Sequence, residues 1–297
     1  MAFHVKRALA DGASYAFVSD SGSVDTAIVY VHGFLGDAQS TWEHLQYYTD
    51  RLPGEPFRDV DLFFYGYQAE SNFVHISASH LRAFLHQMFP LPPAELLTVQ
   101  FRDLDWRLPY DPESITLRER QPYSRLVLVG HSLGAVVVRR LIADAALATA
   151  AERTSLDDQE AAQLLNSELV LMAPAHIGFQ PSGRTALLQL IPFSRSALRL
   201  GAFFRAFSDL QPGCHILTQL QRETAKMADV FPHSLALRPM ILWGDNENVV
   251  AVGRFDSDDP AAMKVAEGKD HVTVCKLNLD YLMPAELVLL RGLARGA

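Results

Sequence analysis

The chain has 297 residues, of which 49% are hydrophobic and 20% are charged, a balance typical of a globular protein with a sizeable core. Its formal net charge of -8 argues against nucleic acid as the main partner, because phosphate neutralisation needs a basic face. The same negative charge disfavours binding to an anionic membrane surface.

Membrane-spanning, disulfide-rich and metal-binding classes find no support in the sequence. No stretch is long and apolar enough to cross a membrane, and the N-terminus carries no apolar run of signal-peptide length. The two cysteines, Cys214 and Cys275, lie in separate segments without metal-ligand spacing. We therefore expect a cytoplasmic protein without stable membrane insertion, metal or other cofactor, and the sequence leaves the oligomeric state open.

The first part of the chain alternates strand and helix patterns, which calls for a parallel sheet. Residues 1–26 fit an N-terminal hairpin or an irregular segment with a short strand at 15–18. The strands that follow are continuous apolar runs, and the helices show apolar residues at helical spacing. The expected strands are Ala27–Val31 and Val60–Tyr65, and the expected helices are Trp42–Leu52 and Val74–Met88.

A glycine-rich turn, His32-Gly33-Phe34-Leu35-Gly36, follows the strand at 27–31. Backbone N–H groups of such a turn point across the top of the sheet. In hydrolases whose nucleophilic serine lies in a tight turn between a strand and a helix, this loop supplies the second of the two N–H groups that bind the oxyanion formed in the reaction. We therefore expect the backbone N–H of Phe34 to be one of the two oxyanion donors. His32 is expected to brace the loop and to take no part in catalysis.

Residues 89–124 interrupt the alternation and are rich in proline and charge, so we expect a loop insertion there. The stretch LVLVGHSLGAVVVRRL at 126–141 then places Gly-x-Ser-x-Gly between an apolar strand and a helix. The glycines permit a turn tight enough to lift Ser132 above the sheet and expose it. N–H groups at the start of the helix, that of Leu133 among them, favour an oxyanion. The pattern predicts that Ser132 is a nucleophile.

A second long interruption follows the serine turn. Residues 143–163 continue the helical pattern, and residues 169–172 predict a short strand. Residues 176–237, rich in leucine and phenylalanine with interleaved arginines, predict a helical cap. Its apolar face either packs on the sheet domain or opens as a lid on lipid, and either arrangement would shape an apolar pocket. We expect both insertions to belong to a single domain of residues 1–297.

The last part of the chain supplies an acid and a base in the order that a serine triad requires. A buried strand expected at 240–243 precedes Asp245 and Glu247, and either carboxylate is placed to orient a histidine. His271 follows in a short polar loop before the closing helix. The order serine, acid, histidine predicts that Ser132, one of the two acids and His271 act together.

Four segments resemble a known superfamily. They are HGFLGDAQSTW at 32–42, FYGY at 64–67, GHSLGAVVVRRL at 130–141 and KDHVTVCKLNLDY at 269–281. On these segments the chain resembles the α/β-hydrolase superfamily over most of its length, and within it the lipase-like serine esterases related to the serine active site containing protein family. The resemblance implies an α/β-hydrolase fold, with a mostly parallel central sheet, flanking helices and an inserted helical cap.

The resemblance also implies roles for single residues. Ser132 would be the nucleophile and His271 the base. For the acid, the spacing of the superfamily before a valine pair favours Glu247, whereas the narrower family favours Asp245 at the strand end, and we prefer Glu247. His176 is shifted by one position from the family pattern, so we expect no catalytic role for it.

These residues predict a serine esterase or lipase-like hydrolase that acts on an apolar small-molecule or lipid ester through an acyl-enzyme intermediate. Two alternatives stay open. One is an acyltransferase or phospholipase that uses the same triad, and the other is a non-catalytic binding protein that keeps the fold.

Overall fold

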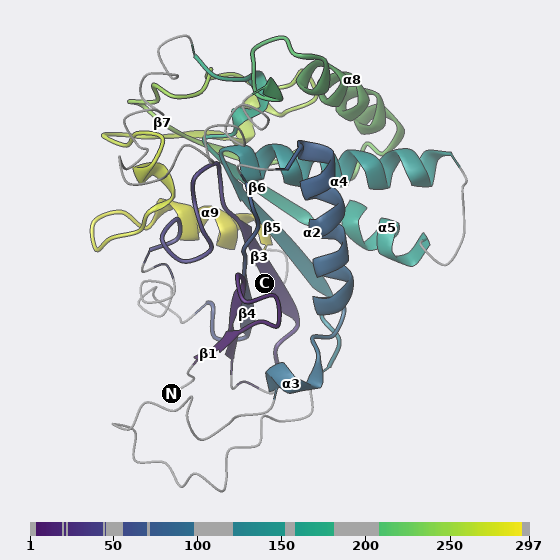
Figure 1. The fold of residues 1–297 in the computed structure, drawn as a ribbon, viewed down its shortest axis with the longest axis vertical. Helices are drawn as coiled ribbons and strands as arrows, with labels where there is room; N and C mark the ends of the chain where they lie inside the picture. The colour runs from purple at the N-terminus through teal and green to yellow at the C-terminus, as the bar shows by residue number, and fades with distance from the viewer. Residues whose placement is uncertain are drawn as a thin grey trace, which may run out of the picture.

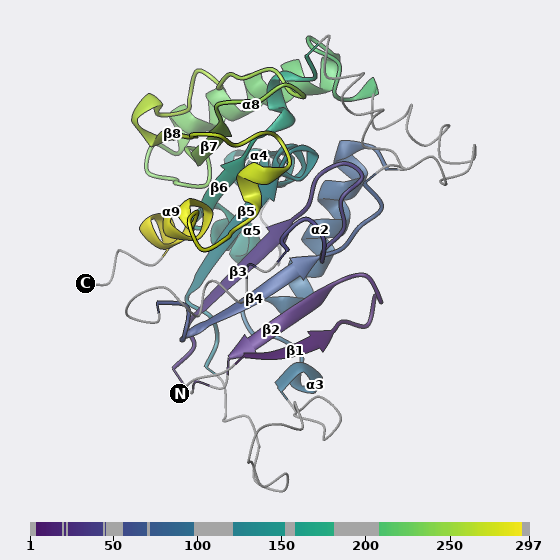
Figure 2. The same ribbon diagram turned by 90° about the vertical axis from the view of Figure 1, so that its left-hand side faces the viewer.

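The computed structural model describes residues 4–19, 21, 23–43, 45, 56–69, 72–97, 121–151, 158–180 and 208–292. The strands at its centre are β1 (His4–Ala8), β2 (Tyr15–Ser19), β3 (Thr26–Val31), β4 (Val60–Tyr65), β5 (Arg125–His131), β6 (Glu168–Met172), β7 (Met240–Gly244) and β8 (Met263–Ala266). Within the described residues they form one eight-stranded sheet in the order β1-β2-β4-β3-β5-β6-β7-β8. Figure 1 shows the sheet in the middle of the molecule, and Figure 2 labels every strand.

The sheet is parallel from β4 through β3 to β8 in its spatial order. β1 and β2 form an antiparallel hairpin at the N-terminal end, and β2 also pairs antiparallel with β4. In the register, Val31 lies beside Gly130, and His131 lies beside Met172. The C-terminal ends of β3, β5 and β6 therefore meet at one edge of the sheet, and the predicted mostly parallel arrangement is confirmed.

Helices cover both faces of the sheet (Figure 2). They are α2 (Val74–Met88), α3 (Ala94–Leu97), α4 (Leu133–Ala150), α5 (Asp158–Leu165), η2 (Ala175–Ile177), α8 (His215–Val230), η3 (Pro260–Ala262), η4 (Thr273–Cys275) and α9 (Met283–Gly292). α4 packs on β3 and β5 and is surrounded by α2, α5 and α8, whereas α9 packs on β5, β6 and β7 from the opposite side. Most residues of α4 are buried, because the sheet and the other helices enclose it.

The predicted elements agree with the structure where the sequence pattern is strong. The strand at 60–65 and the helix at 74–88 have the predicted bounds. The helix expected over 143–163 divides, because α4 ends at Ala150 and α5 begins at Asp158. β8 is not among the predicted strands, because Lys264 interrupts its short segment and leaves no apolar run. Lys264 and Val265 are exposed in this edge strand.

The two predicted insertions are described only in part. Residues 98–120 of the first and residues 181–207 of the second lie outside the described residues, as does most of the helix expected at 42–52. The described end of the second segment includes α8, which packs against α4. The loop insertion at 89–124, the cap at 176–237 and the single domain of residues 1–297 therefore stay predictions.

A buried ion pair joins α4 to the segment that follows β7. Arg139 Nη2 lies 2.6 Å from Asp258 Oδ2, and the two side chains are 1% and 0% exposed. The same carboxylate oxygen accepts the N–H of Phe255, and the guanidinium lies 4.3 Å from the centroid of the Phe255 ring. Because a buried charge without its partner is costly, the pair holds the two segments in one relative position.

Replacement of Arg139 by methionine leaves the Asp258 carboxylate buried without its cation. We expect Arg139→Met to lower the free energy of unfolding, measured in urea, by about 3–5 kcal/mol. The double variant Arg139→Met/Asp258→Leu should recover most of this loss, because an apolar pair replaces a buried ion pair at little cost. A double variant that is less stable than Arg139→Met would contradict this account of the pair.

Candidate active site

The serine predicted to be the nucleophile lies in a strained turn between β5 and α4. Ser132 has φ 53° and ψ -120°, a left-handed conformation that costs a residue with a Cβ roughly 1–3 kcal/mol. Its N–H donates to the carbonyl of Met172 at the end of β6 (3.0 Å), and its own carbonyl accepts the N–H groups of Ala135 and Ala175 (3.2 Å each). Neighbouring elements thus hold the strained turn in place.

Two glycines permit this turn. A Cβ on Gly130 would lie 2.6 Å from the Cα of Ala135, and a Cβ on Gly134 would overlap with the carbonyl of Val31 at the end of β3. Only residues without a side chain let α4 begin so close to the sheet. The first N–H groups of α4, which have no acceptor within the helix, are thereby placed beside the loop that follows β3.

Three side chains from separate loops form a hydrogen-bonded row. His271 Nε2 lies 2.9 Å from Ser132 Oγ, and His271 Nδ1 lies 2.9 Å from Glu247 Oε2. When Nδ1 donates its proton to the carboxylate, the lone pair of Nε2 is directed at the serine hydroxyl. The arrangement therefore suits proton transfer from the serine to the histidine.

Glu247 is the acid that reaches His271. Its side chain is 1% exposed, and its Oε1 accepts the N–H groups of Val249 (2.8 Å) and Val250 (3.0 Å). These bonds fix the carboxylate so that Oε2 faces the imidazole. Asp245, by contrast, is exposed in the turn directly after β7. The geometry therefore favours Glu247 over Asp245 as the partner of His271.

The loop that carries His271 is held by Asp270. Asp270 Oδ1 accepts the N–H groups of Val272 (3.0 Å) and Thr273 (2.8 Å) and the hydroxyl of Thr273 (2.7 Å). Partial burial alone would raise the pKa of the Asp270 carboxyl, but these hydrogen bonds outweigh burial and lower that pKa below its usual value. The ionised carboxylate thus closes the turn before η4.

A second histidine, His131, connects the serine turn to the same loop. His131 Nε2 donates to the backbone carbonyl of His271 at 2.8 Å, and its side chain is buried. Burial, followed by the charge of His271, lowers the pKa of His131 from 6.5 to about 3. The His131 ring is therefore neutral at ordinary pH, with its proton on Nε2 for this bond.

The loop after β3 contains the second expected oxyanion donor, Phe34. The Gly36 N–H donates to the carbonyl of Gly33 at 3.1 Å, which closes a tight turn around Phe34. His32 Nδ1 donates to the same carbonyl at 2.9 Å, and His32 Nε2 accepts the N–H of Tyr67 at 3.3 Å. His32 thus braces the loop, as the sequence analysis predicts.

A pocket of about 190 Å³ lies next to Ser132 and His271. It is lined by Gly33, Phe34, Leu35, Gly36, Ser40, Thr41, His131, Ser132, His271, Val272, Cys275 and Lys276. Ser132 is 3% exposed, so the expectation of an exposed serine is wrong. The reason is that Gly33 and His271 lie directly against its side chain.

Cys275 is buried in the pocket wall, where its thiol donates to the carbonyl of Thr41 (3.5 Å).

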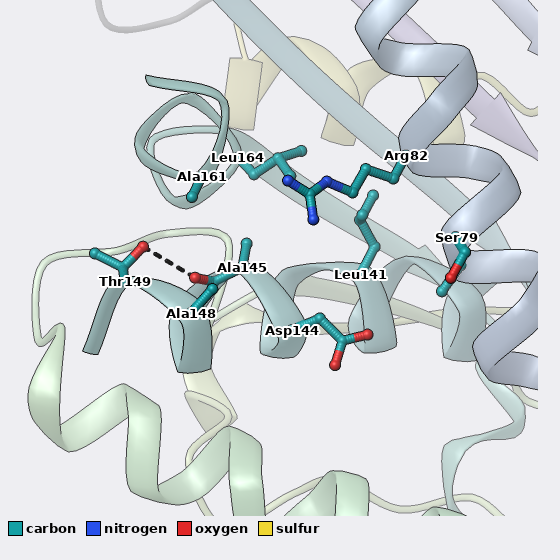
Figure 3. Close-up of a pocket in the computed structure, with 10 residues that line it drawn as sticks. Ser79, Arg82, Leu141, Asp144, Ala145, Ala148, Thr149, Ala161 and Leu164 are labelled. Carbon is teal, nitrogen blue, oxygen red and sulfur yellow. Dashed lines mark hydrogen bonds between the residues drawn. The ribbon is translucent and has the colours of Figure 1, made fainter. Parts of the chain in front are cut away.

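A second hollow, of about 290 Å³, lies between α2, α4 and α5 (Figure 3). Small side chains of α4 form much of its lining, and the Arg82 side chain extends across it from α2. Arg82 donates two hydrogen bonds to Glu160 of α5. The hollow begins at Leu141, which the helical rise places about 12 Å along α4 from the serine turn. We therefore assign it no part in the site.

His176 lies outside the row of three side chains, as expected. Its Nε2 donates to the carbonyl of Gly253 at 3.0 Å, and the ring is buried.

Within the described part of the chain, no cluster of three or more His, Cys, Asp or Glu residues is arranged to hold a metal ion. Among those same residues, none of the helices combines the length and apolar content that crossing a membrane requires.

The strand order and the serine turn between β5 and α4 are the two observations that define the fold. The chain has the α/β-hydrolase fold. No protein-family model matches the sequence, and no curated protein matches it.

Several solved structures are similar to the chain at low identity. Phospholipase PlaB of Legionella pneumophila is 16% identical, with 91% of this chain and 58% of that chain covered and a TM-score of 0.49. An extracellular α/β-hydrolase of a Paenibacillus species is 13% identical, with 90% and 99% covered and a TM-score of 0.45. The Pyrococcus furiosus esterase Pf2001 is 13% identical, with 98% and 93% covered and a TM-score of 0.41. The chain thus spans 58% of the length of the phospholipase.

The lowered pKa of His131 predicts that folding is sensitive to acid. The unfolded side chain binds a proton near pH 6.5, whereas the folded one does so only near pH 3. The contribution of the neutral His131 ring to the free energy of unfolding is complete above pH 6.5 and is lost as the pH falls toward 3. The loss is at most about 1.4 kcal/mol per pH unit. We therefore expect the free energy of unfolding of His131→Gln to fall less steeply with decreasing pH than that of the native protein.

Urea unfolding between about pH 7 and about pH 4.5 measures this slope. Glutamine keeps an N–H donor for the carbonyl of His271 but does not titrate. His86→Gln is the matched control, because His86 is exposed on α2, and its slope should equal the native one. Equal slopes for His131→Gln and the native protein would refute the prediction.

Proposed function

We propose that the chain is a serine hydrolase that cleaves carboxylic esters, with Ser132 as the nucleophile, His271 as the general base and Glu247 as the acid that orients the base. The observation that carries the proposal is the pair of 2.9 Å contacts that run from Ser132 Oγ through the imidazole to Glu247 Oε2. The sequence resemblance to lipase-like serine esterases related to the serine active site containing protein family supports the same roles.

The first step forms a covalent intermediate. His271 Nε2 takes the hydroxyl proton of Ser132 while Oγ attacks the acyl carbonyl. The Glu247 carboxylate stabilises the resulting imidazolium and keeps the Nδ1 proton directed at Oε2. The imidazolium then gives its Nε2 proton to the departing alcohol oxygen, and Ser132 remains acylated.

Both tetrahedral intermediates carry an oxyanion that needs donors at the top of the sheet. We assign this role to the backbone N–H groups of Phe34 and Leu133. Leu133 is the first residue of α4, so the positive end of the helix dipole adds to the stabilisation. In the second step His271 takes a proton from water, the water oxygen attacks the acyl carbonyl, and the acid leaves as Ser132 recovers its proton.

The proposed substrate is a small-molecule or lipid ester. The pocket next to Ser132 has a volume of about 190 Å³, and its wall includes apolar side chains such as Phe34 and Leu35. The cap predicted at 176–237 would add apolar surface above this pocket and exclude water from it. We therefore expect esters with an apolar acyl or alcohol part to be cleaved.

Active-site titration with a fluorophosphonate tests the proposed triad. We expect one equivalent to attach to Ser132, located by peptide mapping, and none to attach to Ser132→Ala. Glu247→Gln should lower kcat for a 4-nitrophenyl ester by about 10³–10⁴-fold, because the imidazole loses the carboxylate that fixes its tautomer. Asp245→Asn is the matched control, and its kcat should stay within about twofold of the native value, since an exposed charge outside the row contributes little.

Three outcomes would contradict this proposal. Labelling at a residue other than Ser132 would refute the nucleophile, and a loss in Asp245→Asn equal to that in Glu247→Gln would refute the choice of acid. A native protein that stays unlabelled both in buffer and with detergent micelles, which open interfacial lids, would refute the hydrolase proposal itself.

A further inference from the structure

The pocket next to Ser132 contains a charged side chain that the proposed reaction does not use. Its lining consists largely of glycine, hydroxyl and apolar residues, together with His131 and His271. Among the described residues that line it, Lys276 is the one with a cationic or anionic side chain other than these histidines. A residue with a cationic side chain therefore lines the pocket in which Ser132 would attack an ester.

Lys276 combines a fixed backbone with a long side chain. It follows η4, and its N–H donates to the carbonyl of Thr273 at 3.2 Å, which ties it to the loop that carries His271. Burial and the charge of His271 are the first causes of the lowered pKa of His131, and the charge of Lys276 also contributes. The charge of Lys276 therefore makes a minor electrostatic contribution at His131, which lies in the serine turn.

Glu43 holds this ammonium in the structure. Lys276 Nζ lies 3.2 Å from Glu43 Oε2, and the two side chains are 31% and 52% exposed. Glu43 closely follows Thr41, which lines the pocket, so the pair joins the segment after β3 to the His271 loop at the pocket. Because an ion pair this exposed contributes little to stability, an incoming anion can replace Glu43 at small cost.

We propose that Lys276 binds an anionic group, a carboxylate or a phosphate, on the ester that Ser132 attacks. This inference rests on the proposed esterase function and adds a substrate class to it, namely esters that carry a negative charge close to the scissile bond. A lysine ammonium is a point charge on a flexible stem, so it accepts either anion without a fixed geometry. The anionic group would take the place of Glu43 beside the ammonium.

Two matched pairs of esters test the preference for charge. The first pair, 4-nitrophenyl pentanoate and mono-4-nitrophenyl glutarate, differs by a terminal carboxylate, and the second, 1-butyrylglycerol and its 3-phosphate, differs by a phosphate. The measured quantity is the ratio of kcat/KM for the anionic ester to kcat/KM for its neutral partner. We expect this ratio to fall about tenfold in Lys276→Met, which loses a charge-assisted contact, and to be largely kept in Lys276→Arg.

Two further variants sharpen the comparison. Lys264→Met is the matched control, because it removes the same charge from the exposed edge strand β8, and its ratio should equal the native one. Glu43→Gln should raise the ratio, because the carboxylate no longer competes for the ammonium. A fall for one pair alone supports the proposal and identifies the anion as a carboxylate or a phosphate. Equal ratios in Lys276→Met and the native protein for both pairs would overturn it.

A binding measurement separates this proposal from the proposed function. Ser132→Ala is titrated with glutarate and with inorganic phosphate, and binding is followed by NMR chemical shifts. We expect saturable binding of at least one anion, lost in Ser132→Ala/Lys276→Met and kept in Ser132→Ala/Lys264→Met. Such binding, together with a native protein that hydrolyses none of the four esters, would refute the esterase and support the anion site. Hydrolysis without a charge preference and without binding that depends on Lys276 would refute the anion site alone.

Discussion

The turn at Ser132 depends on a contact that admits no side chain. Where α4 begins, Gly134 meets the carbonyl of Val31 at the end of β3, and Gly130 meets the first turn of α4 itself. Because β3 and β5 are paired in register, this contact brings the serine, the first N–H groups of α4 and the loop after β3 to one point. Hydrogen bonds to β6 and η2 hold the strained backbone. The other side chains of the site thus gather around a position that the sheet fixes.

His271 is positioned from three directions. Glu247 contacts its ring from the loop after β7, Asp270 closes the turn in which it lies, and His131 donates to its backbone carbonyl from the serine turn. Burial keeps His131 neutral, and this matters because a second positive charge would oppose the imidazolium that the proposed reaction forms. Carboxylates therefore supply the charged contacts that hold His271 and its loop, and a buried imidazole supplies the neutral donor.

Local sequence patterns predict the buried strands and the serine turn well, because apolar runs and the Gly-x-Ser-x-Gly spacing are properties of neighbouring residues. The exposed edge strand β8 has no such run and is missed. They leave the acid open, because Asp245 and Glu247 follow the same strand and only the shape of the turn decides which carboxylate reaches the imidazole. The pair of Arg139 and Asp258 is beyond such patterns, since 119 residues separate its partners. The burial of Ser132 is likewise made by two loops that are distant in sequence.

Cys275 lies in the wall of the same pocket, in the loop that carries His271, and burial makes it unreactive. Burial raises the pKa of its thiol to about 12, so almost no thiolate is present at neutral pH. Alkylating reagents and peroxides attack the thiolate and not the thiol. A sulfur atom thus fills space beside the serine without making the pocket sensitive to oxidation or to thiol-directed inhibitors.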